Sequence, residues 1–157
     1  GQASNQDLRS CEIAWIEDSE LRNLLLSLCH KANVNAEWNL QILGAEGLQY
    51  TVYNEGNYYD WHVDCKAQLR SQMMGMCPDS PVRKISLTLF LNDPEEYEGG
   101  ELELELYGPS QKERSVKFKE SKGTVMFFPS DTWHKVNPVK SGVRKSLVTW
   151  FGGSPYV

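Results

Sequence analysis

"RKISLTLFLNDPEEYEGGELELELYG" (residues 83–108) contains two runs in which every second residue is apolar. The first run has leucine or isoleucine at positions 85, 87, 89 and 91, and the second has leucine at positions 102, 104 and 106. Successive side chains of a β-strand point to opposite faces, so this alternation is typical of strands. The Asn, Asp, Pro and Gly residues between the runs favour a reversal of the chain. We therefore predict two strands here, with the glutamates of the second run on a solvated face.

Segments of the same kind occur throughout the chain beyond residue 45. They are LQYTVYN (48–54), RSVKFKE (114–120), GTVMFFPS (123–130) and VRKSLVTWFGG (143–153). Short strands with frequent turns indicate an antiparallel sandwich or jelly roll. The predicted fold class is mainly β with an N-terminal helix.

That helix is expected in "EDSELRNLLLSLCHKAN" (residues 17–33). Leucines at 21, 24, 25 and 28 follow the spacing of a buried helical stripe. Asp18 or Ser19 can cap its start, and Asn33 is a plausible end. We expect one domain over residues 1–157, with a supporting helix at about 18–33 and a β core at about 48–151.

Composition excludes several classes of function. The net charge of -5 lacks the basic character of a nucleic-acid binder. No run is long enough to span a membrane, and the first ten residues lack the apolar core of a signal peptide. The four cysteines, Cys11, Cys29, Cys65 and Cys77, form no CxxC or disulfide-framework pattern. We expect a cytoplasmic protein with reduced thiols and no membrane partner.

"NYYDWHVDC" (residues 57–65) contains a histidine and an aspartate two positions apart. In an extended strand His62 and Asp64 project from the same face, while Val63 and Cys65 point away. An imidazole beside a carboxylate is either a buried hydrogen-bonded pair or part of a metal site. The segment alone leaves both interpretations open.

A second histidine lies in "FFPSDTWHKVNPVKSGVRKSLVTWF" (residues 127–151). Turn residues at 138–142 between two β-like runs suggest a hairpin. A hairpin centred near Val139 puts Arg144 opposite His134 on the same face, with Lys145 pointing away. Two histidines and one carboxylate form the facial triad of non-haem Fe(II) oxygenases, which leaves positions for a 2-oxo acid and dioxygen. A nearby guanidinium suits the far carboxylate of a dicarboxylic co-substrate.

Three segments also resemble a known family. "YNEGNYYDWHVD", "LFLNDPEEYEGGELEL" and "GTVMFFPSDTWHKVNPVKSGVRKSLVTW" resemble prolyl 4-hydroxylase-type 2-oxoglutarate oxygenases, and most closely the small bacterial and phage members with the PKHD-type domain. The resemblance covers Leu48 to Phe151 and implies a double-stranded β-helix, which is a jelly roll. It implies His62, Asp64 and His134 as iron ligands and Arg144 as the anchor of 2-oxoglutarate.

The same resemblance implies a role for Tyr53, a set of cofactors and a class of substrate. Tyr53 is either a second hydrogen-bond donor to 2-oxoglutarate or a core tyrosine. The cofactors implied are Fe(II), 2-oxoglutarate and dioxygen, with ascorbate as an optional reductant. The substrate implied is a proline-containing peptide or protein, with a free amino acid or small metabolite as the alternative.

Three rival classes fit parts of the pattern. A zinc hydrolase can use two histidines and a carboxylate, but it needs a nearby general base and has no need for Arg144. A nucleophile built from Cys65 requires the thiol on the histidine face, and strand parity points it away. A metal-free jelly-roll binding module would use His62 and His134 as core residues. The stretch Cys65 to Pro81 lacks strand alternation, and we expect it to close over a bound substrate.

Overall fold

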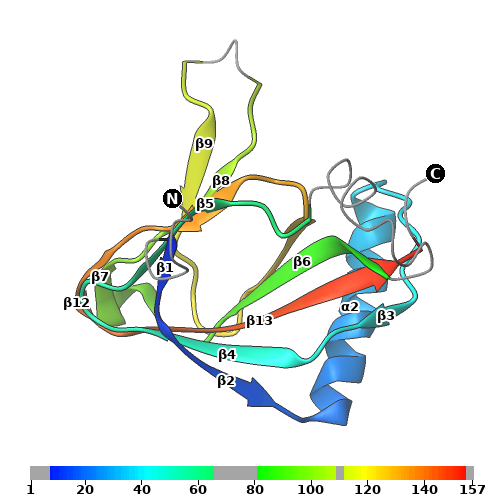
Figure 1. The fold of residues 1–157 in the computed structure, drawn as a ribbon, viewed down its shortest axis with the longest axis horizontal. Coiled ribbons are helices and arrows are strands. Elements are labelled where there is room, and N and C mark those ends of the chain that lie inside the picture. The colour runs from blue at the N-terminus through cyan, green and yellow to red at the C-terminus, as the bar shows by residue number, and fades with distance from the viewer. Residues whose placement is uncertain (1–7, 66–80, 109–111, 155–157) are drawn as a thin grey trace, which may run out of the picture.

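In the part of the chain that the structure describes, two large antiparallel sheets face each other, and one α-helix covers the outer face of the larger sheet (Figure 1). The computed structural model describes residues 8–65, 81–108 and 112–154. The predicted mainly-β jelly roll with an N-terminal helix is confirmed. No helix within these ranges is long and apolar enough to cross a membrane.

The larger sheet carries the strands predicted from the apolar alternation. Its order is β10-β6-β13-β4-β2, and β3 also pairs with β13. The strands are β2 (Glu12–Ile16), β3 (Gly44–Ala45), β4 (Leu48–Tyr53), β6 (Val82–Phe90), β10 (Val125–Pro129) and β13 (Arg144–Gly153).

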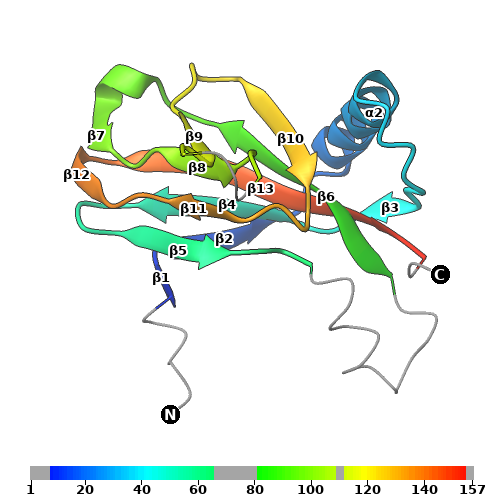
Figure 2. The same cartoon turned by 90° about the horizontal axis from the view of Figure 1, so that it is seen from above.

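The smaller sheet lies across from it, as the view from above shows (Figure 2). Its order is β1-β5-β11-β8-β9. The strands are β1 (Arg9–Ser10), β5 (Tyr58–His62), β8 (Leu102–Glu105), β9 (Ser115–Phe118) and β11 (His134–Val136). A separate ribbon pairs β7 (Tyr97–Gly99) with β12 (Val139–Gly142), and a single 3₁₀ turn, η1 (Pro94–Glu96), precedes it.

Strand β6 lies between the cavity and the helix, so both of its faces are covered. Ser86 and Thr88 line the cavity between the sheets, and Phe90 belongs to the core there. Ile85 and Leu87 point to the opposite face and belong to the core that α2 (Ser19–Asn35) covers. Because β6 is covered on both faces, its period-two pattern separates a helix-facing set from a cavity-facing set.

Helix α2 begins as predicted, because the Asp18 carboxylate accepts a hydrogen bond from the Leu21 amide. Leu25 is buried against the sheet, but Leu24 is 55% exposed, so its place in the predicted stripe is wrong. The helix also continues to Asn35, beyond the predicted end at Asn33. Leu24 and Leu25 are adjacent, and the curved sheet covers only one of them.

The glutamates of the second alternating run do not all lie on a solvated face. Glu103 is only 6% exposed, although it points away from the buried side chains of Leu102 and Leu104. Its carboxylate accepts hydrogen bonds from the Ser115 hydroxyl and the Asn137 amide. The prediction is therefore wrong for Glu103, because polar neighbours on β9 and after β11 cover it.

The predicted hairpin between residues 134 and 144 is also wrong. His134 begins β11, which pairs with β5 and β8, whereas Arg144 begins β13 and pairs with Tyr53 of β4. The chain between them crosses from the smaller to the larger sheet through β12. Arg144 and His134 nevertheless line the same cavity, because the two sheets face each other.

The segment 66–80, which we expected to close over a substrate, lies outside the described residues. Its two flanking residues are described: Cys65 is buried and Pro81 is exposed. The expectation for the segment remains a prediction.

Asn33 joins the end of α2 to the chain that follows it, and this generates a test of stability. Its side chain donates to the Leu40 carbonyl (2.8 Å) and accepts from the Leu40 amide (3.0 Å). Asn33→Ala removes both bonds from a buried position, so we expect a loss of about 2 kcal/mol in unfolding free energy by urea denaturation. The matched control is Asn35→Ala, an exposed residue of the same helix, which should change stability little. Equal stability of the two variants would contradict this role of Asn33.

Candidate metal centre

Two histidines on neighbouring strands of the smaller sheet face each other across the ladder. His62 ends β5 and His134 begins β11, and the two residues are paired in register. Their ring centroids lie 4.1 Å apart. Directly opposed residues of an antiparallel pair share a face of the sheet, so both imidazoles point into the cavity.

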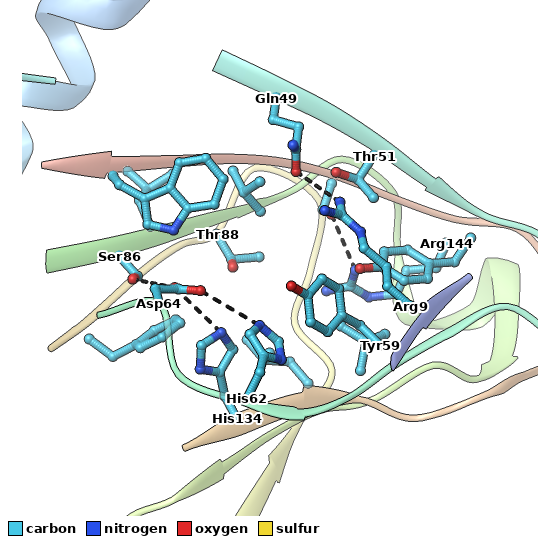
Figure 3. A pocket seen from close by; sticks show the side chains of 18 of the residues that line it. Arg9, Gln49, Thr51, Tyr59, His62, Asp64, Ser86, Thr88, His134 and Arg144 are labelled. Carbon is cyan, nitrogen blue, oxygen red and sulfur yellow. Dashed lines mark hydrogen bonds and ion pairs between the residues drawn. The ribbon is translucent and has the colours of Figure 1, made fainter. Parts of the chain in front are cut away.

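Asp64 completes the group immediately after the end of β5. One carboxylate oxygen lies 3.6 Å from Nε2 of His62, and the other lies 3.5 Å from Nε2 of His134 (Figure 3). The Ser86 hydroxyl, from the facing sheet, donates to the same carboxylate at 2.5 Å. Backbone bonds from the amides of Asp64 and Cys65 to the Ser130 carbonyl fix the turn that places it there.

Hydrogen bonds of the two Nδ1 atoms show which ring nitrogen of each histidine faces the cavity. Nδ1 of His62 lies 2.7 Å from the Asp60 carbonyl, and Nδ1 of His134 lies 2.8 Å from the Thr132 carbonyl. A carbonyl oxygen only accepts, so in each neutral imidazole Nδ1 carries the proton. Nε2 of each ring then presents a lone pair to the cavity, which is how metal-binding histidines are oriented.

The ionisation of the group also suits a cation. Burial, together with the neighbouring His134, lowers the pKa of His62 from 6.5 to about 4. Burial alone would raise the pKa of Asp64, but the adjacent His134, the donated hydroxyl of Ser86 and the adjacent His62 lower it to about 2. At neutral pH His62 is therefore neutral and Asp64 is charged, so neither has to lose a proton to bind a metal.

The ligand atoms of His62, Asp64 and His134 all lie within 4.8 Å of one another. Two imidazoles and one carboxylate on one side of a cavity are the donor set of a facial triad, and they fit a non-haem iron. The structure thus brings together the three residues that the sequence predicted as ligands.

Arg144 lies at the other end of the same cavity, which has a volume of about 220 Å³. It is 2% exposed, its Nη1 donates to the Ser146 hydroxyl at 3.2 Å, and its Nε has no hydrogen-bond partner. Among the described residues no carboxylate pairs with it. A buried guanidinium without an acid is costly, so this end of the cavity suits an anion.

Tyr53 is buried beside this guanidinium. The guanidinium carbon of Arg144 lies 5.2 Å from the centroid of the Tyr53 ring, and the two residues are paired in register. Tyr53 is 4% exposed, lines the cavity and also packs in the core between the sheets. Both predicted roles of Tyr53 are therefore compatible with its position.

Sequence reasoning missed the polar groups that support these residues. Ser86 contacts Asp64, and its place between two apolar residues of an alternating strand could have indicated an inward polar side chain. Arg9 and Tyr59 also line the cavity. Arg9 lies on a strand of two residues, which gives no periodic signal.

Two rival interpretations fit the cavity poorly. Asp64 is the only acidic residue among the described residues that line it, so a hydrolase would lack a second carboxylate as general base. Cys65 lines a different pocket, away from His62, as strand parity predicted.

The family follows from comparison with known proteins. A model of the 2OG-Fe(II) oxygenase superfamily matches residues 48–152. The chain belongs to this superfamily. It is 39% identical over 103 residues to a PKHD-type hydroxylase of Xylella fastidiosa (strain 9a5c) and 41% identical over 105 residues to one of Psychrobacter sp. (strain PRwf-1). The predicted resemblance to PKHD-type oxygenases is confirmed.

These matches cover 65% and 64% of this chain but only 42% and 36% of the two relatives. The chain therefore spans less than half the length of the curated relatives it matches. Among solved structures, a collagen prolyl hydroxylase of Paramecium Bursaria Chlorella virus-1 in complex with 2OG has a TM-score of 0.67 at 26% identity, covering 92% of this chain and 80% of that one. A Pseudomonas putida prolyl-4-hydroxylase has a TM-score of 0.69 at 20% identity, covering 95% and 75%, and shows the same fold.

The lowered pKa of His62 predicts a pH dependence of stability in the metal-free protein. The folded state favours the neutral ring, so this contribution is complete above pH 6.5 and is lost as the pH falls toward about 4. We expect the unfolding free energy to fall by on the order of 3 kcal/mol across this window, measured by urea denaturation. His62→Gln has no titrating ring and should show a flatter profile. An identical slope in both proteins would contradict the assignment.

Proposed function

We propose that this protein is an Fe(II)- and 2-oxoglutarate-dependent hydroxylase. In this proposal His62, Asp64 and His134 bind the iron, and Arg144 binds the far carboxylate of 2-oxoglutarate. The observation that carries it is the two-ended cavity, with three metal-type ligand atoms at one end and a buried, acid-free guanidinium at the other. The family membership of residues 48–152 supports it.

The chain's own residues orient the reactants. Iron with 2-oxoglutarate and dioxygen supplies the oxidising power for hydroxylation of a C–H bond. Ser86 fixes the Asp64 carboxylate, and the two backbone carbonyls fix the rings of His62 and His134. Arg144 with Ser146, and the hydroxyl of Tyr53, orient the co-substrate from the opposite sheet.

The substrate we propose is a prolyl residue of a peptide or protein. The named relatives are PKHD-type hydroxylases, and a structural neighbour is a collagen prolyl hydroxylase. Trp15 and Trp150 also line the cavity and offer an aromatic surface for a ring. A free amino acid or a small metabolite is the alternative substrate with the same cofactor chemistry.

The role of Arg144 has a direct kinetic test. Arg144→Ala removes charge-assisted hydrogen bonds to the co-substrate, so the KM for 2-oxoglutarate should rise by about 10- to 100-fold. Succinate formation reports turnover, and Mn(II) affinity should remain close to that of the wild type. The matched control is Lys145→Ala, because Lys145 is exposed on the other face of the same strand. A larger effect for Lys145→Ala than for Arg144→Ala would contradict the assignment.

The substrate class can be tested by mass spectrometry of the products. Peptide pools containing proline, incubated with the protein, iron and 2-oxoglutarate, should yield products heavier by one oxygen atom at prolyl residues. The His134→Ala variant, which lacks a proposed iron ligand, should yield none. If turnover occurred only with free amino acids or metabolites, the peptide proposal would fail while the oxygenase proposal would stand.

A further inference from the structure

A second arginine enters the cavity from outside the region that the family model matches. Arg9 lies on β1, at the edge of the smaller sheet, where it is paired with Tyr59. Its Nη2 donates to Oε1 of Gln49 at 2.9 Å, its Nε donates to the Cys11 sulfur, and its guanidinium carbon lies 4.8 Å from the centroid of the Tyr59 ring. Gln49 belongs to the larger sheet, so this side chain reaches from one layer to the other.

All of these contacts are with neutral groups. Three arginines line the cavity, and Arg83 is paired with Glu46 through contacts of 2.6 and 2.9 Å. Arg9 and Arg144 have no such carboxylate within the described parts of the chain. The cavity therefore contains two cations that no described acid neutralises, a buried one (Arg144) and a half-buried one (Arg9). A guanidinium that loses contact with water favours an anion beside it.

Both guanidiniums act on the hydroxyl of Tyr53. Burial raises the pKa of the Tyr53 hydroxyl, and the charges of Arg144 and Arg9 oppose that rise. In Figure 3 the side chains of Arg9 and Arg144 lie on one side of Tyr59, and His62, whose ring centroid is 3.6 Å from that of Tyr59, lies with Asp64 and His134 on the other. The cavity measures only about 220 Å³, so an anion beside Arg144 is within electrostatic reach of Arg9.

We propose that Arg9 is a second binding residue for the far carboxylate of 2-oxoglutarate, acting with Arg144 from the opposite sheet. This inference rests on the proposed function. Gln49 and Tyr59 fix the guanidinium before the ligand arrives, so little side-chain freedom is lost on binding. Two cations at one end favour a dicarboxylic 2-oxo acid over a monocarboxylic one of the same length.

A purely structural role for Arg9 makes a different prediction. If Arg9 only connects Gln49 to Tyr59, its loss loosens the cavity and lowers the affinity for every ligand by a similar factor. If Arg9 binds the far carboxylate, its loss lowers the affinity for 2-oxoglutarate much more than the affinity for 2-oxopentanoate. The second acid has the same five carbons but lacks that carboxylate.

The test is calorimetric titration of both acids into the Mn(II)-loaded protein. Arg9→Gln should lower the affinity for 2-oxoglutarate by about tenfold or more, and the affinity for 2-oxopentanoate by less than about threefold. Arg9→Lys keeps the charge and should retain most of the affinity for 2-oxoglutarate. The matched control is Arg83→Gln, whose charge is already neutralised by Glu46, and it should leave both affinities nearly unchanged.

Three results would overturn the inference: wild-type affinity for 2-oxoglutarate in Arg9→Gln, an equal fold loss for both acids, or a loss in Arg9→Lys as large as in Arg9→Gln. Failure of wild-type, Mn(II)-loaded protein to bind 2-oxoglutarate would overturn the proposed function as well. The first three results leave the proposed function intact, so the two failures are distinguishable.

Discussion

The carboxylate of Asp64 joins the parts of this structure on which the candidate site depends. It lies between the Nε2 atoms of His62 and His134 on one sheet and accepts the Ser86 hydroxyl from the other. Three electron-rich ligand atoms this close together repel one another unless a cation lies among them. The protein orients them by hydrogen bonds on their far sides, from two imidazole Nδ1 atoms to backbone carbonyls and from Ser86 to Asp64. The donor set is therefore in place before a metal arrives.

The sandwich architecture gives the cavity two chemically different ends. The metal-type ligands come from the smaller sheet, and Arg144 begins a central strand of the larger one. The packing of two layers sets the separation between these ends, so a bridging ligand needs one metal-chelating group and one distant carboxylate. Arg9 reaches from the smaller sheet to Gln49 of the larger one and adds a second positive charge to the cavity. The charges at the two ends of the cavity are the grounds on which we propose a dicarboxylic 2-oxo acid, and they do not depend on the family resemblance.

Much of this arrangement could be predicted from the sequence, because local patterns carry it. The alternation in β6 and the spacing of His62 and Asp64 each depend on neighbours within a few residues. The connection between His134 and Arg144 could not be predicted in this way. Turn residues at 138–142 indicate that the chain reverses, but they do not indicate that the next strand joins the other sheet.

The burial of individual side chains was predicted less well than the positions of strands, because it depends on residues that are distant in the sequence. Glu103 and Leu24 have the polarity expected of their local patterns, yet distant neighbours cover the first and leave the second exposed. Arg9 lies on a strand too short to have a period, and only the tertiary structure reveals that it lines the cavity.

The central claim is that His62, Asp64 and His134 together bind one divalent metal ion. The most direct measurement is titration of Mn(II), as a surrogate for Fe(II), into wild-type protein and into two histidine variants. The account predicts binding near one ion per chain for the wild type and for His30→Ala, since His30 is exposed on α2 and belongs to no such cluster of described residues. It predicts that His62→Ala abolishes the binding. Full metal affinity in His62→Ala would contradict the account.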